Sequence, residues 1–186
     1  KVLGEEHAET ARTYNNLAVL YRDRGNYVKA EPLYLKALEI RRKVLGEEHT
    51  DTAGTYSSLG WLYYLLGNYR EAEPLYLKAL EIRKKYFGEE HTNTAGTYSN
   101  LATLYKALGD YAKAEPLYLK ALEIRRKVLG EAHRDTAVGY NNLGALYMTL
   151  GNYAKAEPLY LKALEIYKKV LGEEHAETAR TYNNLA

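Results

Sequence analysis

Five histidines recur at one position of the sequence and are the first residues to test for metal chemistry. They stand 42 residues apart, as His7, His49, His91, His133 and His175. Zinc needs its nitrogen ligands within about 2.1 Å, whereas packed helical units lie roughly 10 Å apart. The histidines are therefore too far apart to chelate one ion, and no metal or cofactor is expected. Each should pack against a helix or cap its first turn.

Catalytic patterns are missing from the sequence. Serine, glutamate and histidine occur, but no spacing pairs a nucleophile with a base, and the glycines recur as periodic stops instead of forming a phosphate-binding loop. Acidic pairs such as Glu47 and Glu48 fall in expected turns, where solvated carboxylates precede a helix. The chain has no cysteine, which removes disulfides, thiolate ligands and cysteine nucleophiles. We expect no enzymatic activity.

With metal binding and catalysis not expected from the sequence pattern, ligand binding remains to be considered. The strongest candidates for it are Trp61 and Tyr64. They stand three residues apart in a segment where equivalent positions differ from one repeat to the next. Exposed together on a helix, such rings would be unusual as mere solvent-facing residues and could anchor a ligand side chain. The alternative is that neighbouring helices partly cover Trp61.

Two helices in every 42 residues must position these side chains. Tyr14, Leu17, Ala18 and Tyr21 fall at i, i+3, i+4 and i+7, which predicts a first helix over roughly residues 9–24. Asn26 is a good N-cap for a second helix over roughly residues 27–45. Gly25 and Gly46 mark the two ends. The second helix is apolar over more than one stripe, so it should contact both the first helix of its own unit and that of the next.

The 42-residue period predicts the architecture. Residues 30–40 recur without change at 72–82, 114–124 and 156–166. We expect an all-α, right-handed superhelical solenoid of antiparallel helix pairs, with the first helices on the concave wall. Its expected units are residues 5–46, 47–88, 89–130 and 131–172, with a partial unit at 173–186, in one array over 1–186.

These residues resemble the tetratricopeptide repeat (TPR). Its pattern W-x2-L-G-x2-Y followed by A-x3-F is similar to Tyr14-x2-Leu17-Ala18-x2-Tyr21 and Ala30-x3-Tyr34. The longer unit, with its Leu-Gly-Glu-Glu-His ending, looks like the 42-residue variety of kinesin light chains and bacterial arrays. The resemblance implies a non-enzymatic scaffold. The family often has proline after the linker histidine; Ala8, Thr50 and Thr92 stand there instead.

Variation among the repeats gathers on one face of the first helices, at positions 12, 15, 16, 19, 22 and 23 and their equivalents. By resemblance, this face is the concave, ligand-facing side, and Asn16, Asn100 and Asn142 stand where the family often holds an asparagine that grips a ligand backbone; Ser58 interrupts the series. The expected peptide groove comprises Asn16, Trp61, Tyr64, Asn100, Lys106 and Asn142. Arg12, Arg22 and Lys106 would suit an acidic peptide. Free drift of a solvent-facing surface after duplication explains the same variation.

Composition and charge limit the classes of molecule that the chain is expected to bind. The formal net charge is +2, from 26 basic and 24 acidic residues that are interspersed, so neither nucleic acid nor an anionic membrane is favoured. No apolar stretch approaches the roughly 18 residues of a membrane span, and the first residues do not form a signal peptide. A cytoplasmic location is expected.

Two functions fit this scaffold. The first is binding of peptide segments of other proteins in the groove. The second is a structural array that self-associates end to end, because residues 169–186 repeat residues 1–18 and neither end has the polar cap that solenoids normally need.

Overall fold

The computed structural model describes residues 7–185, and every regular element among them is an α-helix. Residues 1–6 and Ala186, which the expected array includes, lie outside this range. The helices are α1 (Ala8–Asp23), α2 (Tyr27–Val44), α3 (Thr50–Leu65), α4 (Tyr69–Phe87), α5 (Thr92–Ala107), α6 (Tyr111–Leu129), α7 (Arg134–Thr149), α8 (Tyr153–Leu171) and α9 (Ala176–Leu185). The predicted all-α array of helix pairs is confirmed. We refer to the odd-numbered helices as A-type and the even-numbered as B-type.

Helix ends lie where the sequence placed them. The Nδ1 atom of His7 accepts a hydrogen bond from the backbone N–H of Glu9 at 3.1 Å, and the other four histidines cap α3, α5, α7 and α9 in the same way. The capping prediction is confirmed. At the end of α1, Gly25 has φ +73° and its N–H donates to the carbonyl of Arg22, while the N–H of Asn26 donates to that of Tyr21. This is a Schellman ending, which needs the left-handed backbone that glycine adopts without strain.

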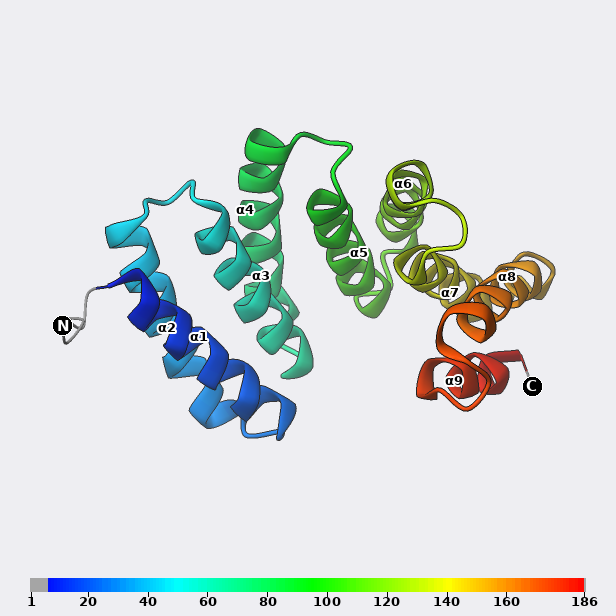
Figure 1. The fold of residues 1–186 in the computed structure, drawn as a ribbon, viewed down its shortest axis with the longest axis horizontal. Helices are drawn as coiled ribbons and strands as arrows, with labels where there is room; N and C mark the ends of the chain where they lie inside the picture. The colour runs from blue at the N-terminus through cyan, green and yellow to red at the C-terminus, as the bar shows by residue number, and fades with distance from the viewer. Residues whose placement is uncertain (1–6, 186) are drawn as a thin grey trace. The chain divides into compact units, whose positions relative to one another are not determined.

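The chain forms two compact units, residues 1–89 and 90–186. Unit 1 holds α1 to α4 and unit 2 holds α5 to α9 (Figure 1). Within unit 1, α2 contacts both α1 and α3; within unit 2, α6 contacts both α5 and α7, and α8 contacts both α7 and α9. The predicted double contact is therefore confirmed for α2, α6 and α8.

Tyrosine and alanine dominate the core. In unit 1, Tyr34 and Leu38 of α2 pack with Tyr56, Leu59 and Leu62 of α3, and small alanines let the backbones approach. Many tyrosines keep their hydroxyls at the edge of this core: Tyr63 donates to Glu31 at 2.8 Å in unit 1, and Tyr147 donates to Glu115 at 2.6 Å in unit 2. Each of these bonds joins an A-type helix to the preceding B-type helix and so fixes the register of the stack.

Candidate peptide-binding surface

The six predicted groove residues divide between the two units. Asn16, Trp61 and Tyr64 belong to unit 1, whereas Asn100, Lys106 and Asn142 belong to unit 2. Asn16 is exposed on α1; the other five side chains are half-buried on α3, α5 and α7. We therefore describe two separate surfaces, one on each unit.

An aromatic stack forms the surface of unit 1. The rings of Trp61 and Tyr64 lie 4.9 Å apart with an interplanar angle of 15°, and Tyr69, the first residue of α4, lies 5.6 Å from Tyr64. Burial raises the pKa of Tyr64, with Tyr69 adding to the shift. Trp61 is partly covered, as the alternative interpretation held, yet the stack still offers contiguous ring surface for an apolar or aromatic ligand group.

A buried hydroxyl lies next to this stack. In α2, the hydroxyl of Tyr34 accepts a hydrogen bond from Arg22 at 3.3 Å. In α4, the equivalent hydroxyl of Tyr76 is buried without a partner, because Tyr64 replaces the arginine. An unpaired buried hydroxyl costs free energy. Unit 1 therefore has a buried hydroxyl without a hydrogen-bond partner beside its aromatic surface.

One of the variable positions does not face a ligand, which corrects the sequence analysis. Ser57, Ser99 and Asn141, equivalent to position 15, are buried. The physical reason is that A-type helices also contact each other within a unit, α1 with α3 and α5 with α7. The apolar stripe of one helix, read from the sequence, does not reveal this second contact between A-type helices.

The asparagine series has a structural use that sequence analysis missed. Asn184 of α9, which is equivalent to Asn16, Asn100 and Asn142, donates from Nδ2 to Oδ1 of Asn141 at 3.1 Å. In unit 1, Ser58 and Asn15 hold the positions equivalent to Asn184 and Asn141, and the buried Oδ1 of Asn15 has no partner. An amide at this position can therefore join neighbouring A-type helices, besides any contact it makes with a ligand.

The cations of this face are less available than expected. Arg22 pairs with Asp23 at 2.7 Å, and Arg12 pairs with Glu9. Burial lowers the pKa of the Lys106 ammonium below its usual range. The described surfaces therefore give little support for a strongly acidic ligand.

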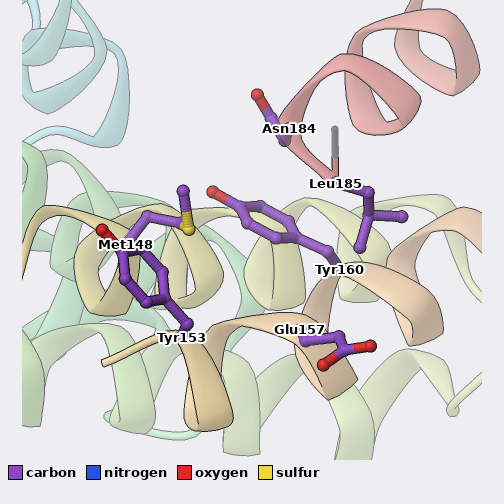
Figure 2. Close-up of a pocket in the computed structure, with 6 residues that line it drawn as sticks. All are labelled: Met148, Tyr153, Glu157, Tyr160, Asn184 and Leu185. Carbon is purple, nitrogen blue, oxygen red and sulfur yellow. The ribbon is translucent and has the colours of Figure 1, made fainter. Parts of the chain in front are cut away.

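A pocket of about 310 Å³ opens in unit 2 between α7, α8 and α9 (Figure 2). Six residues line it: Met148, Tyr153, Glu157, Tyr160, Asn184 and Leu185. Sequence analysis did not find this pocket, because three helices form it. The available signal was Met148, the chain's single methionine, at the position held by Arg22 and Tyr64 in earlier repeats.

No three histidine, cysteine, aspartate or glutamate side chains in residues 7–185 gather as metal ligands. None of the helices described combines the length and apolarity needed to cross a membrane.

Comparisons with known proteins agree with the geometry. A family model described as tetratricopeptide repeat matches residues 9–85, 63–127, 93–157 and 135–186. Among curated proteins, none matches the chain.

Solved structures share the fold. BtubC (BKLC) from P. vanneervenii is 30% identical with a TM-score of 0.76, and the match covers 87% of this chain and 65% of that one. A kinesin light chain-like protein of Podosopora anserina with nearly identical TPR-like repeats is 25% identical with a TM-score of 0.79, covering 96% of this chain and 85% of that one. RapI in its apo form is 24% identical with a TM-score of 0.78, and the match covers 95% of this chain and 61% of that one.

Proposed function

Because this chain belongs to the tetratricopeptide repeat family, we propose that it is a non-enzymatic scaffold that holds peptide segments of other proteins on its A-type helices. Repeats of this family mediate protein–protein interaction, and their fold is a non-catalytic scaffold. The proposal takes a protein ligand in the cytoplasm, not nucleic acid or a membrane, in keeping with the interspersed charges.

The observation that carries the proposal is the stack of Trp61, Tyr64 and Tyr69. Tryptophan and tyrosine dominate binding energy at protein interfaces because they bury a large, rigid surface at low entropic cost. The stack is half-buried, so its rings are preorganised but not fully covered. It suits an apolar or aromatic side chain of an extended or helical peptide.

Unit 2 supplies a more polar surface to the same scaffold. Asn100 and Asn142 are half-buried amides, which can both donate to and accept from a peptide backbone. Lys106 follows Asn100 on the same helix and can add a hydrogen bond to a carbonyl group. In this proposal each unit holds its own segment of ligand.

Peptide display against the full chain tests the proposal. Selected ligands should lose about 1 kcal/mol or more of binding free energy with Trp61→Ala, at unchanged helicity. Tyr86→Ala is the matched control, because Tyr86 is an exposed aromatic residue of α4 outside the stack. Ligands that bind Trp61→Ala and Asn100→Ala, singly and combined, as tightly as the wild type would refute the groove assignment.

A further inference from the structure

We propose that the ring of Tyr63, near the end of α3, binds a lysine or arginine side chain of the peptide ligand, with the carboxylates of Glu31 and Glu71 beside it. This inference rests on the proposed function, since it names a residue class that the ligand carries in addition to its apolar anchor. Tyr63 and Glu71 flank the turn from α3 into α4 (Figure 1), and Glu31 lies on α2, which contacts α3 within unit 1.

In three other repeats, a lysine of the chain itself covers the tyrosine equivalent to Tyr63. It stands eight residues after the tyrosine, in the first turn of the next helix. The distances from Nζ to the ring centre are 5.4 Å for Lys29 and Tyr21, 4.9 Å for Lys113 and Tyr105, and 4.8 Å for Lys155 and Tyr147. An ammonium group within about 6 Å of a tyrosine ring is attracted by its negative face. This place in the repeat therefore accepts a cation.

The second repeat lacks this lysine, because Glu71 stands at its position. Among residues 7–185, no lysine or arginine lies over the ring of Tyr63. Arg70, the residue before Glu71, does not take the place of the lysine. It is exposed at a position that points into solvent, since the equivalent Val28 is 86% exposed. The ring of Tyr63 is thus without the charge that covers its equivalents.

Tyr147 of α7 gives a matched comparison. Tyr63 donates to Glu31 at 2.8 Å and Tyr147 donates to Glu115 at 2.6 Å, so the two rings are anchored in the same way. Tyr147, which Lys155 covers, is 7% exposed, whereas Tyr63 is half-buried. The ring surface that meets a lysine in unit 2 is therefore partly open to a ligand in unit 1.

The replacement of lysine by Glu71 also reverses the charge beside the ring. Burial, then the carboxylate of Glu31 and then that of Glu71 raise the pKa of Tyr63 to about 12. Neither glutamate forms an ion pair within the part of the chain that the structure describes. A cation of the ligand would gain from the ring face and from both carboxylates, whereas an acidic group would be repelled. The site therefore selects a basic side chain.

This site adjoins the aromatic stack of unit 1. Tyr63 precedes Tyr64 on α3, and Glu71 follows Tyr69 by two residues in the first turn of α4. One peptide is therefore expected to place an apolar group on the stack and a basic side chain on Tyr63. A lysine or arginine suits this arrangement, because its methylene groups cover ring surface while its charge stays near the carboxylates and water.

Parallel peptide display against the wild-type chain and the Glu71→Lys chain tests the inference. Glu71→Lys restores the residue of three other repeats, so the fold should accept it, and the new lysine should cover Tyr63 itself. Peptides selected on the wild type should be enriched in lysine or arginine at a fixed spacing from their apolar anchor. Peptides selected on Glu71→Lys should lack this enrichment.

Calorimetry on synthetic copies of the selected peptides gives the size of the effect. Replacing the basic residue by uncharged norleucine should weaken binding to the wild type about threefold to tenfold and leave binding to Glu71→Lys unchanged. Glu81→Lys is the matched control. It makes the same charge change about 15 Å further along α4, where only the surface pair with Lys78 is disturbed. Its preference for the basic peptide should equal that of the wild type.

The outcomes separate this inference from the proposed function. Peptides that depend on Trp61 but carry no preferred basic residue would refute the inference and leave the proposed function standing. A preference that Glu71→Lys and Glu81→Lys reduce equally would reflect overall charge and would also overturn it. If no peptide binds through Trp61, the proposed function fails and the inference fails with it.

Discussion

Units 1 and 2 build the contact between successive A-type helices in different ways. In unit 2, Asn184 donates to Asn141, and Ala145 and Met148 stand at the positions of Trp61 and Tyr64. In unit 1, Ser58 is too short to serve Asn15, whose Oδ1 is buried without a partner, and the aromatic stack lies on the same helix as Ser58. The helix that lacks this amide, α3, is therefore the one that carries the aromatic stack.

A second difference lies between the B-type helices and the A-type helices that follow them. In unit 1, the buried Arg41 donates to the hydroxyl of Thr55 at 2.6 Å and to the carbonyl of Asp51 at 2.8 Å. In unit 2, Gly139 replaces that threonine, and Nη1 of Arg125 is buried without a partner. Burial lowers the pKa of both guanidinium groups. The Nη1 atom of Arg41 thus has two acceptors where that of Arg125 has none, although Nε of Arg41 is itself buried without a partner.

Removing the hydrogen bond between Arg41 and Thr55 should have the largest effect on stability. Thr55→Ala should lower the free energy of unfolding by about 2 kcal/mol, because a buried charged donor loses one of its two acceptors. Thr55→Ser keeps the hydroxyl and should cost less than half as much. Chemical denaturation of both variants measures the difference. Equal losses would mean that the methyl group, and not the hydrogen bond, stabilises this contact.

The hydrogen bond between Asn184 and Asn141 should be transferable to the equivalent place in unit 1. Gaining or losing it should change the free energy of unfolding by about 1 kcal/mol. Ser58→Asn supplies a donor for Asn15 and should stabilise the protein, whereas Asn184→Ser leaves Asn141 unpaired and should destabilise it. Ser58→Ala controls for the loss of the serine and should not stabilise. Thermal unfolding of the three variants checks the signs, and a destabilising Ser58→Asn would contradict the proposed equivalence of the two places.

The smallest expected effect is the loss of stability at alkaline pH, and it should be similar in both units. Burial, followed by a hydrogen bond to Glu31, raises the pKa of Tyr63 to about 12, and burial with a bond to Glu115 raises that of Tyr147 to about 12. Unfolded tyrosine ionises near pH 10. Their contribution to stability is therefore fully present below about pH 10 and is lost as the pH rises towards 12.

Phenylalanine variants test this pH dependence. Tyr63→Phe and Tyr147→Phe should each lower stability slightly at neutral pH and flatten its decline between about pH 10 and 12. Unfolding midpoints measured across that range give the slopes. Matching slopes in wild type and variants would show that these hydroxyls do not ionise differently on unfolding.

Sequence reasoning succeeded where one residue fixes one local feature. The predicted ends of the first two helices lie within one residue of α1 and α2, because histidine and asparagine caps and glycine stops mark each boundary. It failed where two helices distant in sequence decide the environment. Burial of Ser57 and Asn141 depends on contact between A-type helices, and the unpaired hydroxyl of Tyr76 depends on the identity of residue 64. The lining of the pocket beside Met148 likewise depends on three helices.

The central claim, that the α3 surface of unit 1 binds protein segments, is tested most directly through Trp61, the single tryptophan of the chain. Its fluorescence reports on the stack alone, so display-selected peptides can be titrated into the unlabelled protein. We predict a saturable change in Trp61 emission whose midpoint equals the dissociation constant measured by calorimetry. Peptides that bind by calorimetry but leave the Trp61 emission unchanged would contradict the claim.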